Sequence, residues 1–343
     1  MNATTPPEQS DQPLVSLLLA CYEQQDVVER AVQAALAQTY SPLEILISDD
    51  ASSDDTFARI EHAVRGYRGP HRVLMRRNAQ NEGISAHFSR LVTLAQGELL
   101  FVAAGDDVSE PQRCERVVAH WLAQHRQPLL IATDLYDLDE HGEIHGVIAH
   151  TPLDGFDLDQ WCRARPWLVG ASHVWAKTLF EHFGPMQAGA HAEDQIMLLR
   201  AILIGHASTL HEPLVRWRRG GLSSKQRPAN LAAHIARMCR GNQAALVALQ
   251  QHVADAVRAE RAAPVQAALT TSLCRARYTA TMLCNSGANP ALRAVVDARG
   301  VPLGYRLRLF GYARLPWMYD FFIRLKHRLR IRRGADAAGR PPK

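Results

Sequence analysis

Short apolar runs alternate with stretches of helical periodicity through the first 133 residues of the chain. Such runs are typical of strands buried on both faces of a parallel sheet. Each strand-plus-helix unit takes roughly 25–30 residues, which is the pattern of βαβ crossovers. We expect strands at 14–19, 43–48, 73–75, 99–103 and 129–133, and helices at 26–38, 56–67, 84–95 and 111–125. The pattern predicts an α/β fold with a doubly wound, mostly parallel sheet flanked by helices.

The regular alternation stops after about residue 135. The sequence predicts a hairpin turn at 137–146, a strand at 168–173 and a helix at 193–204, and then Ala- and Arg-rich helices from 228 to about 285. We expect Asp26 to cap the first helix of the chain. The domain organisation that we expect is a disordered leader at 1–12, a sheet domain at 13–225, a helical C-terminal region at 226–333 and a disordered end at 334–343.

Positive charge is concentrated in the tail. The chain has a net charge of +5, yet residues 301–343 alone hold eleven Lys and Arg against two Asp and Glu. The body is therefore acidic, and we expect no nucleic-acid partner. Aromatic and basic residues interleave at near-helical spacing in 315–333, which predicts a basic amphipathic helix at an anionic membrane surface. A helix docked on the protein with its basic side in solvent is the alternative.

The six cysteines and the apolar content bear on the compartment. The cysteines, none of them in a CxxC pair, are residues 21, 114, 162, 239, 274 and 284. This pattern predicts reduced thiols that pack as small hydrophobic side chains. Residues 1–12 do not resemble a signal peptide, and no apolar run approaches the length of a membrane span. We therefore expect a cytoplasmic protein, peripheral on the inner face of the membrane where the tail binds lipid.

Acidic residues follow the second expected strand. The run Ser48-Asp49-Asp50-Ala51-Ser52-Ser53-Asp54-Asp55-Thr56 places four carboxylates within seven residues. Ligands of such sheets bind beyond the carboxyl ends of the strands, where a carboxylate can accept hydrogen bonds from a base or a ribose. Asp54 or Asp55 is suited to cap the next helix. A solvated acidic turn is the alternative for the whole cluster.

Two further acidic sites follow in the sequence. Asp106 and Asp107 come directly after the fourth strand and suit a divalent cation that holds a diphosphate, or a cap for the helix near Pro111. Glu193 and Asp194 begin an apolar helix, where the helix dipole favours acids even without a function. His141 and His145 flank the expected hairpin turn, so we assign them no metal.

The order of these motifs resembles glycosyltransferase family 2. The segments that carry the resemblance are 17–22, Gln38-Thr39-Tyr40, 47–52 with 54–56, Asn81-Glu82-Gly83, Gly97-Glu98, Gly105-Asp106-Asp107 and Glu193-Asp194. The resemblance covers about residues 13–220. It implies a GT-A fold and the transfer of a sugar, with inversion, from a nucleotide-diphosphate donor to an acceptor hydroxyl. A UDP-sugar is the most expected donor.

The resemblance implies roles residue by residue. Asp194 would be the general base that deprotonates the acceptor, with Glu193 beside it. Mn²⁺ or Mg²⁺ at Asp106 and Asp107 would neutralise the departing diphosphate. The residues implied in binding the nucleotide-sugar are Ala20, Tyr22, Glu23, Asp49, Asp50, Asn81, Gly83, Asp106, Arg218 and Arg219.

The chain departs from the family pattern at two of these motifs. Ala104 stands where the metal motif Asp-x-Asp-Asp has its first Asp. Trp217-Arg218-Arg219-Gly220 stands where Tyr-Arg-x-His is often found, so Gly220 replaces the histidine. Arg218 or Arg219 is suited to give positive charge to the diphosphate instead. Surface charge is the equally weighted alternative for both arginines.

The acceptor is less constrained than the donor. A saccharide or a lipid-linked sugar of a surface polysaccharide fits the tail and the habit of the family. Trp161, Trp167 and Trp175 precede the third acidic site, where each either faces a sugar ring or packs in the core. The helices of 226–333 would cap the catalytic domain, shape the acceptor site or mediate homo-oligomer formation. Two other functions stay open: a nucleotidyltransferase of similar fold, and a non-catalytic GT-A-fold subunit that binds a nucleotide or a partner.

Overall fold

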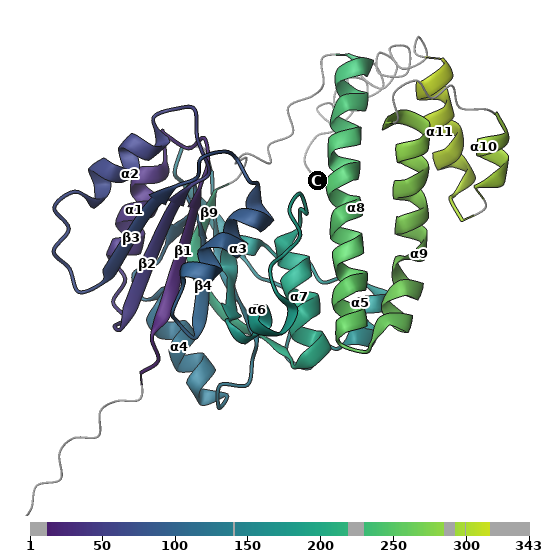
Figure 1. Ribbon diagram of the computed structural model, residues 1–343. Helices are drawn as coiled ribbons and strands as arrows, with labels where there is room; N and C mark the ends of the chain where they lie inside the picture. The colour runs from purple at the N-terminus through teal and green to yellow at the C-terminus, as the bar shows by residue number, and fades with distance from the viewer. Residues whose placement is uncertain (1–11, 140, 219–229, 285–291, 299, 316–343) are drawn as a thin grey trace, which may run out of the picture. The chain divides into compact units, whose positions relative to one another are not determined.

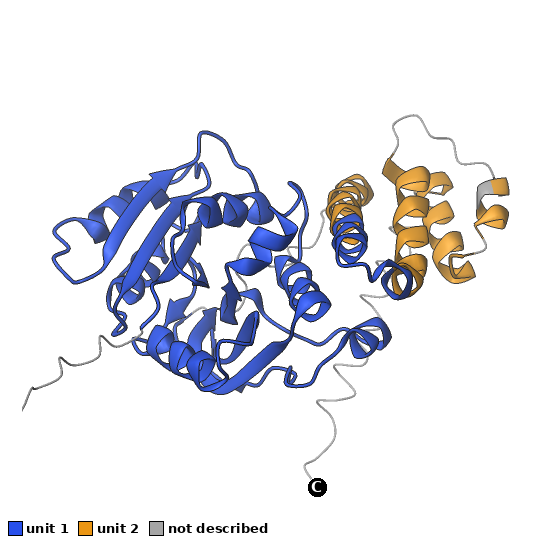
Figure 2. Cartoon of the chain, turned by 60° about the horizontal axis from the view of Figure 1, so that its bottom comes forward, with its two compact units in different colours: residues 1–225, 250–265 blue, residues 226–249, 266–343 orange. Residues whose placement is uncertain are grey.

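The computed structural model describes residues 12–139, 141–218, 230–284, 292–298 and 300–315. The chain divides into two compact units, coloured separately in Figure 2. Unit 1 consists of residues 1–225 and 250–265, and unit 2 of residues 226–249 and 266–343. The second piece of unit 1 comes from the end of one long helix and the start of the next, so the unit that holds the sheet also includes part of the helical C-terminal region.

Unit 1 is built on one nine-stranded sheet (Figure 1). Its strand order is β3-β2-β1-β4-β8-β6-β9-β5, and β7 pairs with β6. The strands are β1 Val15–Cys21, β2 Leu43–Asp49, β3 Arg72–Arg77, β4 Leu99–Ala104, β5 Val108–Ser109, β6 Leu130–Leu138, β7 Ile144–Ile148, β8 His173–Ala176 and β9 Ala207–Arg218. Strands β1 to β4 pair in parallel, as do β6 and β9, whereas β5, β7 and β8 pair antiparallel with their neighbours. The expected sheet is confirmed, with β3-β2-β1-β4 parallel as predicted, but the sheet as a whole is mixed because β5, β7 and β8 run antiparallel to their neighbours.

Helices cover both faces of the sheet. They are α1 Val28–Leu36, α2 Thr56–Val64, α3 Ile84–Leu94, α4 Arg113–Ala123, α5 Leu158–Arg163, α6 Thr178–Phe183 and α7 Glu193–Ile204. Val32 of α1, Ile60 of α2 and Trp121 of α4 share one core cluster with inward-facing strand residues. On the other face, the Phe88 ring of α3 packs edge-on against Trp175 of β8. The result is a three-layer arrangement whose strands must be apolar on both sides.

The central strands show why the sequence pattern is so clear. Every residue of β1 and β2 is buried. Because side chains alternate between the faces of a strand, a strand covered on both faces needs an apolar residue at nearly every position. The exceptions are satisfied internally: Ser16 donates a 2.6 Å hydrogen bond from its hydroxyl to Glu44, and Gly97 donates from its N–H to Ser16 Oγ.

Two local expectations are wrong. The expected strand at 168–173 is instead the 3-10 helix η1 (Gly170–Ser172) followed by β8, because Ser172 donates both its N–H and its hydroxyl to the Val169 carbonyl and closes a turn. Asp26 does not cap α1. That helix has Val27 at the N-cap without a side-chain cap, and the Gln24 carbonyl accepts hydrogen bonds from the N–H groups of Val27 and Val28.

Helices make up the described part of unit 2. Two of them, α8 (Leu231–Arg258) and α9 (Ala262–Thr279), also contribute residues to unit 1. The π-helix η2 (Ala280–Cys284), α10 (Leu292–Asp297) and α11 (Leu303–Arg314) complete the described part. A small core gathers Tyr278, Met282, Val295, Val301 and Leu309. No helix in the described part of the chain has the length and apolar character that crossing a membrane requires.

A disulfide joins Cys239 of α8 to Cys284 of η2. The expectation of six reduced thiols is therefore wrong for this pair, and only Cys21, Cys114, Cys162 and Cys274 are free. The two partners are 45 residues apart, so no short spacing could reveal them; the fold brings their Cα atoms to 5.4 Å. Closing a loop of that length stabilises a fold by about 4 kcal/mol through the entropy of the unfolded chain.

Several expectations fall outside the described residues. The leader up to residue 11, the residues Arg219 and Gly220, and the tail from 316 to 343 are among them. The amphipathic helix expected at 315–333 therefore stays a prediction.

Gly97 offers a test of the packing between β1 and β4. A Cβ atom there would lie 2.5 Å from Ser16 N and 2.6 Å from the Val15 carbonyl carbon. Because both contacts are to backbone, we expect Gly97→Ala to destabilise the protein by about 1–3 kcal/mol in urea unfolding. The matched control is Gly241→Ala on exposed α8 surface, where a Cβ meets nothing within 4 Å. There we expect a gain of about 1 kcal/mol. An unchanged urea midpoint for Gly97→Ala would contradict the packing described.

Candidate active site

The loops that follow β1 and β2 are tied together by hydrogen bonds. Glu23 Oε1 accepts hydrogen bonds from Ser53 N and Ser53 Oγ, at 2.7 and 2.9 Å, and Glu23 N donates to Ser52 Oγ. Gln24 N donates to Thr56 Oγ1 at 2.7 Å. Glu23 and Ala51 adopt left-handed φ angles of 52° and 61°. Such a conformation costs a non-glycine residue about 1–3 kcal/mol, so the network holds both loops in conformations that they would not adopt alone.

Asp49 is buried and turned into the protein. Its carboxylate accepts hydrogen bonds from the N–H and the hydroxyl of Ser52 and pairs with Arg77 Nε at 3.1 Å. The helix cap that the sequence expects of Asp54 or Asp55 is not formed, because Asp55 is the N-cap of α2 and makes no side-chain cap hydrogen bond. Asp54, one residue earlier, accepts the Thr56 N–H at Oδ1. Within this acidic run, Asp49 and Asp54 thus shape the turn.

Asp50 organises the loop between β3 and α3. Its carboxylate accepts hydrogen bonds from Asn78 Nδ2 at 2.6 Å and from the N–H groups of Glu82 and Gly83, both at 2.9 Å. Asn81 Nδ2 donates to the Asp50 carbonyl. The structure therefore brings Asp50 together with Asn81 and Gly83, which lie 31 and 33 residues further along the chain. Ala20 is joined to the next site, because its carbonyl accepts the N–H of Gly105. Tyr22 lies half-buried after β1.

Asp106 and Asp107 differ in their surroundings. Asp107 is buried, and its Oδ1 accepts the Arg218 N–H at 2.9 Å. Burial and the neighbouring charge of Asp106 raise the pKa of Asp107 well above its usual value. Burial also raises the pKa of the half-buried Asp106, while the charge of Arg218 lowers it. The carboxyl end of β9 thus brings Arg218 to the acidic pair.

The first two acidic sites meet around Cys21. Burial raises the pKa of the Cys21 thiol, and the charges of Asp49 and Asp106 raise it further. The ends of β1, β2 and β4 therefore form one acidic edge, as the parallel arrangement of these strands requires.

Arg113 connects this edge with the third acidic site, and sequence reasoning missed it. The side chain is fully buried and donates from Nη2 to the carbonyls of Ala171 and His173, at 2.9 and 3.3 Å. Burial lowers the pKa of Arg113 to about 10, and the charge of Asp107 opposes that shift. The available signal was an arginine on the otherwise apolar face of the helix that follows Pro111.

Glu193 and Asp194 begin α7 behind a strained residue. Ala192 has a left-handed φ of 65°, and a Cβ atom on Gly170 of η1 would lie 2.8 Å from Glu193 Oε1. Burial and the charge of Asp194 raise the pKa of Glu193 to about 7. Burial raises the pKa of Asp194, and its hydrogen bond from Gln195 N lowers it. The charge of Asp194 thus helps Glu193 to take up a proton near neutral pH.

The rear of α7 is anchored by a buried ion pair. Arg200 Nε lies 2.8 Å from Asp255 Oδ2, and Arg200 Nη1 donates to the Gly184 carbonyl at 3.0 Å. Gln251 Nε2 donates to Asp255 as well. Asp255 and Gln251 belong to the part of α8 that lies in unit 1. Because removing one partner of a buried pair costs about 3–5 kcal/mol, these contacts hold α7 firmly behind its two acids.

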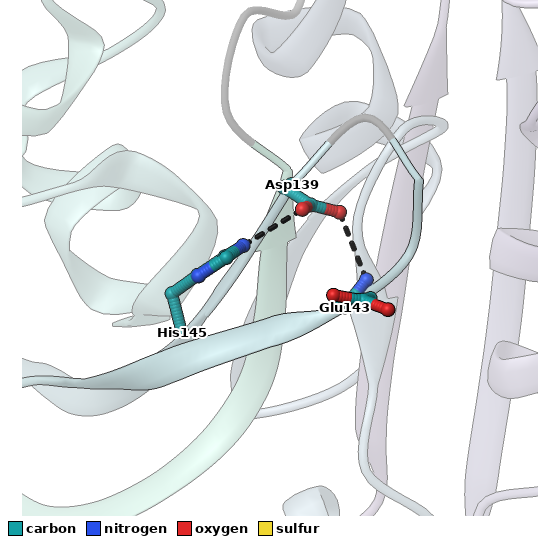
Figure 3. Close-up of side chains that lie close together, drawn as sticks. All are labelled: Asp139, Glu143 and His145. Carbon is teal, nitrogen blue, oxygen red and sulfur yellow. Dashed lines mark hydrogen bonds and ion pairs between the residues drawn. The ribbon is translucent and has the colours of Figure 1, made fainter.

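A second group of metal-ligand types lies on the β6–β7 hairpin (Figure 3). The ligand atoms of Asp139, Glu143 and His145 all lie within 4.8 Å of one another. Asp139 already accepts hydrogen bonds from His145 Nε2 at 2.7 Å and from the Glu143 N–H at 2.9 Å. These bonds lower the pKa of Asp139 to about 2. The group therefore has a structural explanation as a hairpin turn, which the sequence predicted at 137–146.

Comparison with known proteins finds a family match over part of the chain. Residues 16–147 match the family model described as Glycosyl transferase family 2. The chain is 30% identical over 143 residues to WcaA of Escherichia coli (strain K12), named as a colanic acid biosynthesis glycosyl transferase. It is 31% identical over 94 residues to the Escherichia coli UDP-Glc:alpha-D-GlcNAc-diphosphoundecaprenol beta-1,3-glucosyltransferase WfaP. These matches cover 41% and 27% of the chain, and 48% and 36% of the relatives, so each relative is matched over less than half its length.

Among solved structures, the chain is similar to the mannosyltransferase PcManGT from Pyrobaculum calidifontis in complex with GDP-Man and Mn²⁺. The TM-score is 0.52 at 15% identity, and the likeness covers 89% of this chain and 87% of that one. At this identity the likeness is one of fold, and the GT-A fold implied by the sequence motifs is confirmed.

The raised pKa of Glu193 predicts a pH-dependent stability. Between the unfolded pKa near 4.5 and the folded pKa of about 7, the folded state holds a proton that the unfolded state releases, so stability falls as pH rises through this window. Glu193→Gln keeps the neutral form at every pH. We expect its melting temperature to exceed that of the wild type at pH 8 and to match it near pH 4.5.

The control for this measurement is Glu181→Gln, an exposed first-turn glutamate of α6. It should melt in parallel with the wild type across the same range. If Glu193→Gln does so too, the carboxyl pair is not coupled as described.

Proposed function

We propose that this chain, whose residues 16–147 match the model of glycosyltransferase family 2, transfers a sugar from a nucleotide-diphosphate donor to an acceptor hydroxyl, with inversion at the anomeric carbon. One observation carries the proposal: acids from the ends of β2 and β4 meet at one edge of the sheet, and Arg113 links that edge to the segment that packs on Glu193. The residues suited to bind the donor and the acids suited to act as base therefore lie on the same sheet domain. We infer that residues 13–225 are the catalytic domain.

Asp194 is the general base of this proposal. An inverting transfer needs one base that removes the acceptor proton while the diphosphate departs from the other face of the sugar. Burial and the charge of Asp194 raise the pKa of Glu193 to about 7, so Glu193 is protonated in a large part of the molecules near neutral pH. A carboxylate that stays charged is available to the acceptor hydroxyl, and we assign this role to Asp194, as the family resemblance implies.

The donor is assigned to the carboxyl edge of β1, β2 and β4. The loops after β1 and β2 supply Tyr22 and Glu23, and Ala20 lies beneath them in β1. Asp49 and Asp50 fix the surrounding loops, which supports a preformed pocket for the base and ribose beside Asn81 and Gly83. Arg218 reaches the acidic pair and is suited to the diphosphate, a role that we extend to Arg219. WfaP is named as an enzyme that uses UDP-Glc, and the similarity to it favours a UDP-sugar as the donor of this chain.

A divalent cation, Mn²⁺ or Mg²⁺, fits Asp106 better than Asp107. Asp106 is half-buried, whereas Asp107 already uses one oxygen for the Arg218 N–H and Ala104 offers no side-chain ligand. Mg²⁺ is commonly held by one or two carboxylates together with substrate phosphates, which matches this donor set. When bound, the ion would stabilise the charge of the leaving diphosphate.

The acceptor that we propose is a saccharide, free or lipid-linked, of a surface polysaccharide. Two similar proteins support this class of acceptor: WcaA is named for colanic acid biosynthesis, and WfaP is named for a diphosphoundecaprenol-linked acceptor. A lipid-linked acceptor fits a cytoplasmic enzyme at the inner face of the membrane, which the basic residues of 315–333 would bind. The helices of 226–333 remain assigned to capping the domain, shaping the acceptor site or self-association.

Ala104 favours one second candidate, a non-catalytic subunit that retains the fold and binds a nucleotide. The two candidates differ in turnover. An enzyme releases nucleoside diphosphate from its donor sugar repeatedly, whereas such a subunit binds the donor without releasing product.

Asp194→Asn tests the proposed base. Removing a general base lowers the rate by about 10²–10⁴-fold, and we expect this loss in nucleoside-diphosphate release from a panel of UDP-, dTDP-, GDP- and CDP-sugars. Nucleotide affinity should stay unchanged, because Asp194 is not assigned to the donor pocket. Asp159→Asn in the first turn of α5 is the matched control and should keep full activity. Near-full turnover by Asp194→Asn would contradict the assignment.

A further inference from the structure

The tryptophans of unit 1 divide into two groups by exposure. Trp121, Trp161 and Trp175 are exposed by 4%, 1% and 0%. Trp217 is half-buried, and Trp167 is 52% exposed. Of the three candidates for a sugar contact, Trp161 and Trp175 are therefore core residues. Trp167 is the one exposed tryptophan in the described part of the chain.

The Trp167 ring packs against a histidine that hydrogen bonds hold in place. The His150 ring lies 5.4 Å from the Trp167 ring, at an interplanar angle of 42°. His150 is 3% exposed; its backbone N–H donates to Asp134 Oδ1 at 3.0 Å, and its Nδ1 contacts the Thr133 carbonyl at 2.7 Å. Its other ring nitrogen, Nε2, accepts the Val169 N–H at 3.1 Å. The exposed indole therefore has a rigid support, unlike an ordinary surface residue.

The chain on both sides of Trp167 contacts the first turn of α7. The carbonyl of Pro166 accepts a hydrogen bond from Gln195 Nε2 at 3.2 Å. Gly170 packs so closely on Glu193 that a Cβ would lie 2.8 Å from its Oε1. Three residues of chain span at most about 11 Å, so Trp167 lies near the two carboxyl groups.

We propose that Trp167 is an aromatic platform on which a pyranose ring of the acceptor saccharide stacks, with the acceptor hydroxyl directed to Asp194. The inference rests on the proposed function and names the residue that recognises its second substrate. An indole face offers a large, rigid apolar surface at low entropic cost, and the C–H face of a pyranose covers it while the sugar hydroxyls stay in water. Stacking on Trp167 removes exposed apolar surface without burying a charge.

Saturation-transfer NMR tests the platform without a known acceptor. The probes are the methyl pyranosides of glucose, galactose, mannose and N-acetylglucosamine, each added to the full chain with UDP. We expect saturation of the ring C–H protons of at least one glycoside by the wild type. Trp167→Ala should lower that signal by about fivefold, and Trp167→Tyr should keep most of it. The melting temperature should fall only slightly, because Trp167 is 52% exposed although its ring also packs on His150.

Leu94→Ala is the matched control, since Leu94 is an exposed apolar residue of α3, 41% accessible. It should leave the signal intact. If no glycoside gives a signal that depends on Trp167, the platform is refuted. Nucleotide binding on the same samples separates the two levels. If the protein binds UDP, GDP, dTDP or CDP but its sugar signal does not depend on Trp167, this inference alone is overturned. Absence of both nucleotide and sugar binding overturns the proposed function as well.

Discussion

Repulsion among carboxylates at one edge of the sheet is the constraint on which this structure depends. Parallel strands bring the ends of β1, β2 and β4 to the same edge of the sheet. The carboxylates that follow β2 and β4 therefore lie near one another; they are Asp49, Asp50, Asp106 and Asp107. A carboxylate taken out of water is costly unless it is paired, hydrogen bonded or protonated. The local structure around each acid lowers this desolvation cost in a different way.

Each acid is stabilised in its own way. Asp49 pairs with Arg77, and Asp50 accepts hydrogen bonds from two backbone N–H groups and an amide. Asp107 has the Arg218 N–H and the nearby charge of Arg113. Glu193 is instead kept partly protonated, with a pKa of about 7. In the proposed function, the half-buried Asp106 is the acid that would hold a cation. Fixed surroundings of this kind are what a catalytic site needs, because they are already oriented before the substrates arrive.

Sequence reasoning reached the sheet and the acidic motifs for one physical reason. A strand covered on both faces must be apolar throughout, so β1, β2 and β4 were visible as runs, and the acids that follow them stood out. It did not reach Arg113, because the partners of its guanidinium lie about 60 residues along the chain at Ala171 and His173. The Cys239–Cys284 disulfide was missed for the same reason, because its partners lie 45 residues apart. The turn at Gly170–Ser172 has a different cause, the local bonds from Ser172 to the Val169 carbonyl. The tryptophans show the limit most clearly, since composition and spacing treated Trp161, Trp167 and Trp175 alike.

Nucleotide-dependent melting tests the central claim most directly, since a ligand that binds only the folded state raises the melting temperature. The measurement compares UDP, dTDP, GDP and CDP, each with and without Mn²⁺, on the wild type and on Asp106→Asn. The account predicts a shift with one nucleotide that Mn²⁺ enlarges, and the loss of the Mn²⁺ effect in Asp106→Asn. A folded protein that shows no shift with any of the four nucleotides would contradict a donor site at this edge of the sheet.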